Sequence, residues 1–270
     1  RKVGEVMTRN PASIAADSLA IEVLKLVEKK KIGILLYMEG LDFLGTDTGL
    51  LEMLYELGVR GASLVWSRRN VLACGCCPAS ENKDMRGGIT ETGRKAIEKM
   101  QQLQMFLDMS HLNDDGMQEV LEKTDIALLA THSNARAVHM HYRNLTDEQL
   151  SSLEKRKGIV GINACSLLSG SDKSGKHLEM LVRQGRYLTE KMGEDGVCLG
   201  LDLCRNYELA SGDLKSEDDY GHDALTGYDE LVLLTAMFLE SGMEESVIRK
   251  ILGENDRAFF NRYKQNHSIP

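Results

Sequence analysis

The chain has 270 residues, enough for one sizeable hydrophobic core or for two ordinary domains. Its hydrophobic share of 42% and charged share of 27% are typical of a soluble globular protein. The net charge of -8 argues against nucleic acid as the main partner, because phosphate binding requires a basic face and none stands out. No apolar run is long enough to span a bilayer, so we also expect no membrane partner.

The location is indicated by the start of the chain and by its cysteines. Residues 1–10 lack the apolar stretch of a signal peptide. The six cysteines do not show the spacing of a disulfide framework, which fits a reducing compartment. We therefore expect a cytoplasmic protein.

Six short apolar runs of β-prone residues recur along the chain, each followed by a polar residue and then by a helical pattern. Runs this apolar are typical of parallel strands covered on both faces, and they are Ile32–Met38, Ala62–Val65, Met105–Met109, Ile126–Ala130, Gly158–Ile162 and Val197–Leu201. The segments between them are long enough for crossover helices, which we expect at Thr48–Leu57, Thr90–Leu103, Gly116–Lys123, Asp147–Lys157 and Leu178–Lys191. This alternation predicts an α/β fold with a parallel sheet, of the (β/α) barrel kind.

Polar or aromatic side chains follow the six predicted strands at equivalent positions. They are Glu39, Trp66, His111, His132, Asn163 and Asp202. In a parallel barrel such residues converge on the mouth at the C-terminal strand ends, where barrel enzymes place their chemistry. One histidine at a strand end is more often a structural hydrogen-bonding group, but a glutamate, two histidines and an aspartate in register favour a functional site.

The residue types at this mouth suit a divalent metal. Imidazole nitrogen and carboxylate oxygen are ligands of zinc and related ions. A set made of Glu39, His111 and His132 leaves a position open for water, whose pKa the metal lowers, so that this water can attack a carbonyl carbon. Asp202 can then take a proton from the water or deliver one to a leaving amine.

Several short motifs occur in an order that resembles a known family. They are Tyr37-Met38-Glu39-Gly40, Leu57-Gly58-Val59-Arg60, Gly88-Ile89-Thr90-Glu91-Thr92-Gly93-Arg94, Asp108-Met109-Ser110-His111, Thr131-His132-Ser133-Asn134-Ala135-Arg136, Arg143-Asn144-Leu145-Thr146-Asp147 and Gly200-Leu201-Asp202. The order and the sequences are similar to those of the membrane dipeptidase (renal dipeptidase) family of zinc peptidases, in its bacterial cytoplasmic branch. The resemblance runs from about Lys31 to Tyr263 and includes the closing Ile251–Asn255.

The resemblance implies a (β/α)8 barrel of the metal-dependent amidohydrolase kind, a binuclear zinc site, cleavage of dipeptides and a homodimer. Glu39 would bridge the two metals, while His111 and His132 would complete the shell of the second metal. Arg143 would hold the C-terminal carboxylate of the substrate, a task suited to guanidinium geometry. Asp202 would engage the substrate amine and move the proton.

The N-terminal part departs from the family pattern. The family binds its first metal through a His-x-Asp pair on the first strand, whereas no histidine precedes His111. The six runs correspond to the third to eighth strands, so we expect the first two to be missing or replaced, and a six-stranded sheet is not expected to close as a barrel. We therefore divide the chain into residues 1–30, with a start similar to a CBS module at Val3–Pro11 followed by a helix at Asp17–Lys30, and a dipeptidase domain at residues 31–270.

Trp66 is the second departure, because animal members carry a substrate-binding histidine there. It is either a specificity contact or a large apolar plug at the mouth. Three functions stay open from the sequence. The first is a dipeptidase with one or two zinc ions, and the second is an inactive scaffold or metal-binding protein derived from that family. The third is an amidohydrolase acting on another small amide.

Overall fold

The computed structural model describes residues 35–76, 87–170, 177–204, 223–225 and 227–265. Within these ranges, six strands form one parallel sheet in chain order. They are β1 (Leu36–Glu39), β2 (Val59–Ser63), β3 (Phe106–Asp108), β4 (Leu128–Ala130), β5 (Ile159–Ile162) and β6 (Val197–Leu199). Each corresponds to one of the six apolar runs, so the prediction of a parallel α/β fold is confirmed. The expected helix at 17–30 and the CBS-like start lie outside the described residues.

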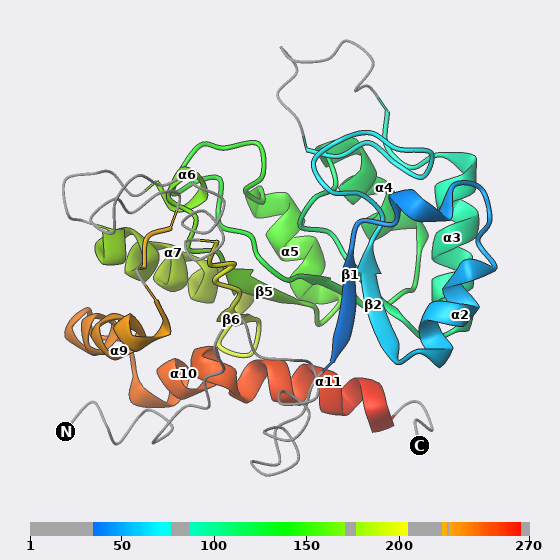
Figure 1. The fold of residues 1–270 in the computed structure, drawn as a ribbon. Coiled ribbons are helices and arrows are strands. Elements are labelled where there is room, and N and C mark those ends of the chain that lie inside the picture. The colour runs from blue at the N-terminus through cyan, green and yellow to red at the C-terminus, as the bar shows by residue number, and fades with distance from the viewer. Residues whose placement is uncertain (1–34, 77–86, 171–176, 205–222, 226, 266–270) are drawn as a thin grey trace.

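Helices follow the strands in alternation (Figure 1). Between strands lie α2 (Leu50–Glu56), α3 (Glu91–Gln102), α4 (Asp114–Lys123), α5 (Asp147–Lys155), α6 (Ser166–Ser169) and α7 (His177–Met192), and after β6 come α9 (Leu231–Glu240), α10 (Glu245–Arg249) and α11 (Asn255–Gln265). Single turns of other helix types lie at η2 (Asp42–Leu44), η3 (Tyr228–Glu230) and η4 (Lys250–Glu254). All five predicted crossover helices are confirmed, with ends within two residues of the predicted ones.

Three of these helices begin at capping residues that the sequence places directly before them. The side chains of Thr90 and Asn113 accept hydrogen bonds from backbone amides in the first turns of α3 and α4. Thr146 and Gln149 form a capping box at the start of α5. Such caps satisfy amide groups that have no partner within the helix, and each contributes about 1 kcal/mol.

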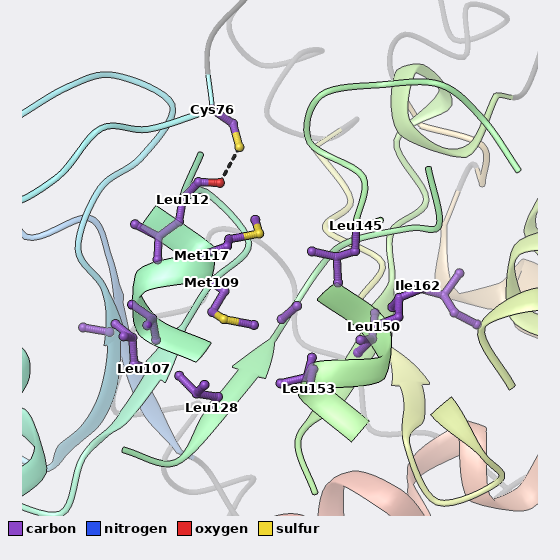
Figure 2. Close-up of a cluster of buried hydrophobic side chains, with 14 of the residues drawn as sticks. Cys76, Leu107, Met109, Leu112, Met117, Leu128, Leu145, Leu150, Leu153 and Ile162 are labelled. Carbon is purple, nitrogen blue, oxygen red and sulfur yellow. Dashed lines mark hydrogen bonds between the residues drawn. The ribbon is translucent and has the colours of Figure 1, made fainter. Parts of the chain in front are cut away.

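The outer face of the sheet packs against the crossover helices. Alternate strand residues such as Leu107, Leu128 and Val160 belong to this main core. Figure 2 shows part of it, with Leu107, Met109, Met117 and Leu128 in one half of the view and Leu150 and Ile162 in the other. Because side chains alternate across a strand, the neighbouring residues must point to the other face.

That other face, called here the inner face, is covered by α11. Phe106, Leu129, Ile159 and Cys198 form a separate cluster with Phe259 of α11. Figure 1 shows α11 passing beneath the strands. The amide of Asn255 anchors the start of this helix by donating to the carbonyls of Glu194 and Val197, at 2.8 and 2.7 Å. In the described part of the chain, the sheet is open and has β1 and β6 as its two edges. Helix α11 covers the face that would lie inside a closed barrel.

The inner face is also filled by aromatic rings. Tyr37 stacks on Phe106 with ring centroids 6.2 Å apart, and Phe106 contacts Phe260 at 5.6 Å. The Phe106 ring occupies the space beside Gly61, where an added Cβ would come within 1.9 Å of it. Gly61 is thus required by the close approach of this ring. No helix in the described ranges is both long and apolar enough to cross a membrane.

Candidate metal centre

The predicted site residues gather at the C-terminal edge of the sheet. Glu39 is the last residue of β1, while His111 and His132 follow the ends of β3 and β4 by three and two residues. The two histidines are buried, with side chains 6% and 9% exposed, whereas the Glu39 side chain is 39% exposed. The two histidines are therefore held inside the protein, and solvent reaches the site at Glu39.

These three side chains form a compact triangle of ligand atoms. Glu39 Oε1 lies 2.8 Å from His111 Nε2 and 3.2 Å from His132 Nε2. The two Nε2 atoms lie 2.9 Å from each other. Within the described ranges, this is the only group of three or more potential ligand side chains close enough to share a metal ion.

The protonation states suit metal binding. Contact with the rings of His111 and His132 holds the pKa of Glu39 well below its ordinary value, so the group is a carboxylate at neutral pH. Burial lowers the pKa of His111, which favours the neutral imidazole. Metal ligands must be deprotonated carboxylate and neutral imidazole, so both groups are already in the form that binds.

The triangle also has a suitable size. Zinc holds nitrogen and oxygen ligands at about 2.0–2.2 Å, which places neighbouring ligand atoms about 3.3 Å apart in a tetrahedral shell. The observed sides of 2.8 to 3.2 Å are slightly tighter, and small side-chain movements would open them to that spacing. The residues present therefore fit one divalent ion with an open position.

Behind His132 lies a polar network that the sequence analysis missed. Thr131 Oγ1 contacts His132 Nδ1 at 2.6 Å and Asp108 Oδ2 at 2.5 Å. Asp108 is fully buried and also receives hydrogen bonds from the amides of Ser110 and Thr131 and from the hydroxyls of Ser110 and Tyr37. Burial acts to raise the pKa of Asp108, but the charge of His132 and the hydroxyl hydrogen bonds outweigh it, and the pKa lies below its ordinary value.

Two glycines allow the segment before His132 to lie close to the sheet. A Cβ on Gly161 or on Gly200 would come within about 2 Å of the Thr131 carbonyl oxygen, at 2.0 and 1.8 Å respectively. The amide of Ser133 donates to the Gly161 carbonyl at 2.8 Å. Any larger residue would push Thr131 and His132 away from β5 and β6.

Arg143 lies directly beside the triangle. It is buried, and its Nη1 donates to the Ser110 carbonyl at 2.8 Å and lies 3.4 Å from His111 Nδ1. Among the described residues, no hydrogen bond is made by its Nε or Nη2. The guanidinium is thus oriented by the loop that carries His111 while retaining donors for a ligand carboxylate.

Trp66 covers one side of His111. The two rings stack with centroids 5.7 Å apart and an interplanar angle of 29°. The tryptophan is 50% exposed, so half of its surface remains accessible beside the His111 ring. Ser67 follows it and places its hydroxyl 3.2 Å from His111 Nδ1.

Asp202 is connected to the triangle through Asn163. The Asn163 amide group lies 3.3 Å from Asp202 Oδ2 and 3.4 Å from the backbone carbonyl of His132. Asp202 is exposed and has a positive φ of 55°, which is uncommon for residues other than glycine but is adopted by aspartate more often than by most. The structure thus brings Glu39, His111 and His132 into direct contact, and it places Asp202 beside them rather than among them.

A protein-family comparison assigns the chain. The model of the family described as "Membrane dipeptidase (Peptidase family M19)" matches residues 2–262. The chain belongs to the membrane dipeptidase family. The family match includes residues 2–30, so the division of the chain at residue 30 remains a prediction.

Solved structures and curated relatives agree with this assignment. A metallo peptidase from Rhodobacter sphaeroides, solved with a phosphinate mimic of the dipeptide L-Ala-D-Ala, superposes with a TM-score of 0.72 at 30% identity, covering 90% of this chain and 67% of that one. An uncharacterized protein encoded in the pqqA 5' region of Klebsiella pneumoniae is 30% identical over 79% of this chain and 81% of its own length. The dipeptidase tcpJ of Claviceps purpurea is 25% identical over 87% of this chain and 52% of its own.

The chain spans about half the length of several curated relatives that it matches. The likeness to the membrane dipeptidase structures confirms the barrel-type α/β fold class predicted from the sequence. The described part of this chain presents six of its strands.

Proposed function

We propose that this protein is a metal-dependent hydrolase that cleaves dipeptides. The observation that carries the proposal is the triangle of Glu39, His111 and His132, with Arg143 oriented beside it. The triangle provides a place for a metal and Arg143 a place for a carboxylate, and a dipeptide has a scissile amide within a few ångströms of its terminal carboxylate. The dipeptide mimic bound to the Rhodobacter relative supports the same substrate class.

We assign zinc as the metal, held by Glu39, His111 and His132. When bound, zinc supplies a Lewis acid and lowers the pKa of a coordinated water towards neutrality. Glu39 Oε2 has no hydrogen-bond partner among the described residues, so Glu39 would also be able to ligate a second ion. The proposal therefore covers one or two ions per chain.

The remaining residues bind the substrate and move the proton. Arg143 pairs with the C-terminal carboxylate, and the exposed half of Trp66 contacts a side chain of the substrate. Asp202, oriented by Asn163, engages the free amine and delivers a proton to the leaving nitrogen. Holding both charged ends of a dipeptide restricts the site to short substrates, because a longer peptide has no carboxylate at that distance from the scissile bond.

Metal content and substrate panels test this proposal together. Elemental analysis of protein purified without chelator should give one or two zinc ions per chain, and His111→Ala should lose at least one of them. His139→Ala is the matched control, because His139 is no part of the triangle, and it should keep the metal. Zinc-loaded protein should hydrolyse dipeptides and lose turnover when the substrate amine is acylated.

The competing functions give different results in the same experiment. Bound metal without turnover of any amide would indicate a metal-binding scaffold and would contradict the proposal. Turnover of N-acyl amino acids in preference to dipeptides would indicate an amidohydrolase for other small amides. Cytoplasmic location and homodimer formation remain predictions, and the half-exposed Leu36 on β1, an edge strand of the described sheet, supports the prediction of a dimer.

A further inference from the structure

Asp108 connects the two loops that carry the histidines of the metal centre. Its Oδ1 accepts from the Ser110 hydroxyl at 2.7 Å and from the Ser110 and Thr131 amides at 2.9 and 3.0 Å. Its Oδ2 accepts from the Tyr37 hydroxyl at 2.7 Å and contacts Thr131 Oγ1. Ser110 directly precedes His111 and Thr131 directly precedes His132, so one buried carboxylate fixes the position of both loops.

The chemistry of these groups determines the direction of each hydrogen bond. An ionised carboxylate can only accept, so the Thr131 hydroxyl must donate its single proton to Asp108. The Thr131 oxygen lies 2.6 Å from His132 Nδ1, and it then has only lone pairs with which to contact that nitrogen. Only a protonated Nδ1 makes a favourable contact there, and this leaves Nε2 as the nitrogen that binds a metal.

We propose that Asp108 is a positioning residue which, through the Thr131 hydroxyl, keeps a proton on Nδ1 of His132 and presents Nε2 to the metal. The inference rests on the proposed metal centre. A carboxylate behind a metal-bound histidine is a known way to fix the ring and raise its basicity. Here the carboxylate acts across one hydroxyl instead of directly.

His111 has no comparable arrangement among the described contacts. Its Nδ1 faces the Ser67 hydroxyl at 3.2 Å, and this hydroxyl can either donate or accept. Arg143 Nη1, which can only donate, lies 3.4 Å from the same nitrogen. The two histidines of the triangle therefore differ, because the proton position of His132 is fixed by a carboxylate and that of His111 is not.

Replacing Asp108 with asparagine should reverse the chain of hydrogen bonds. The asparagine oxygen must remain towards the amides of Ser110 and Thr131, so its NH2 group takes the place of Oδ2 and donates to Thr131. The Thr131 hydroxyl then donates to Nδ1 of His132, and the ring must carry its proton on Nε2. A protonated Nε2 cannot bind a metal, so the variant should bind zinc more weakly.

Two readouts on the full chain test this inference. Nitrogen-15 NMR of the imidazole rings, with the His132 signals assigned by comparison with His132→Asn, reports whether Nδ1 carries a proton. Calorimetric titration of the metal-free protein with zinc reports the affinity. In the wild type Nδ1 should be protonated with and without zinc, whereas Asp108→Asn should lose that proton and about 10- to 100-fold in zinc affinity.

Substitutions at Thr131 test the same link without changing the buried carboxylate, in case Asp108→Asn fails to fold. Thr131→Val removes the hydroxyl at constant shape and should weaken zinc binding to a similar extent. Thr131→Ser keeps the hydroxyl and should restore affinity to within a few-fold of the wild type. Thr124→Val and Asp47→Asn are matched controls away from the centre and should change neither readout.

The outcomes separate this inference from the proposed function. An unprotonated Nδ1 in the wild type would overturn the inference, even if the enzyme binds zinc and cleaves dipeptides. Unchanged zinc affinity in folded Asp108→Asn and Thr131→Val would overturn it as well. Failure of the wild type to bind zinc would overturn the proposed function, while the NMR result would still decide where the His132 proton lies.

Discussion

The Nε2 atoms of His111 and His132 face each other across 2.9 Å, in contact with the same oxygen of Glu39. Two imidazole lone pairs repel at this distance unless a proton or a metal ion lies between them. Buried hydrogen bonds to the surrounding chain hold both rings in place, so the free energy of folding offsets the repulsion between them. The centre is therefore preorganised for a positive charge.

Arg143 offers a test of carboxylate recognition. Arg143→Lys removes the planar pair of donors but keeps the charge, so we expect KM for a dipeptide to rise about 30-fold, equivalent to about 2 kcal/mol, with a smaller change in kcat. Steady-state kinetics of the zinc-loaded protein measure both parameters. A dipeptide amide lacks the carboxylate and should be cleaved with equal efficiency by the variant and the wild type. An equal loss on both substrates would show that Arg143 has another role.

Gly61 tests the packing of the inner face. An added methyl group would come within 2.0 Å of the Phe106 ring, so Gly61→Ala should destabilise the protein by about 1–3 kcal/mol. Urea unfolding followed by circular dichroism measures the change in the free energy of unfolding. Phe106→Leu makes room for the methyl group, so the double variant should lose less than the sum of the two single changes. Additive losses would mean that the ring is not the obstacle.

Asn255 tests the anchor of α11. Its amide donates to two backbone carbonyls, at 2.8 and 2.7 Å, so Asn255→Ala should cost about 1–3 kcal/mol by leaving a buried acceptor without a partner. Asn255→Asp should be more damaging at neutral pH, because it places a negative charge against those carbonyls. Thermal unfolding of the three proteins should rank them wild type, alanine, aspartate. Equal melting temperatures would exclude an anchoring role.

Asp114 gives a prediction with a defined pH dependence. Burial acts to raise its pKa, but the hydrogen bonds of Arg136 and Gln149 and the charge of Arg136 hold the pKa below its ordinary value. A carboxyl with a lowered folded pKa contributes stability above the unfolded pKa of about 3.9, and this stability is lost as the pH falls through the lower folded pKa.

Asp114→Asn should therefore reduce the free energy of unfolding by about 1 kcal/mol at pH 7, a modest value because the Asp114 side chain is 54% exposed. The difference from the wild type should shrink below about pH 4. Urea unfolding at pH 7 and pH 3 measures it, with Asp47→Asn as the exposed control. A difference that grows on acidification would contradict the assigned pKa direction.

The positions of the strands and helices could be predicted from the sequence because apolar runs and capping residues are local signals. The ends were less certain: the fourth run begins at Ile126 whereas β4 begins at Leu128. Glu39, His111 and His132 could be grouped because parallel strands bring their C-terminal ends to one edge. Their contact with each other required the structure.

Asp108 could not be recognised in the same way. It lies inside an apolar run, and its donors come from residues as distant in the chain as Tyr37 and Thr131. The sequence does show a charged residue at the end of an otherwise apolar strand. Such a residue is rarely buried without partners, so its position indicates that hydrogen-bond donors surround it. The covering of the inner face by α11 was likewise not foreseen, since nothing local links Phe259 to Phe106.

That covering has a consequence for how the chain reaches its folded state. Phe259 follows Phe106 by 153 residues, and the two meet in one apolar cluster. Contacts between such distant segments form late, because a long loop must close before they can be made. Until α11 docks, the inner face presents Leu129 and Ile159 to other chains, so refolding yield should fall as protein concentration rises.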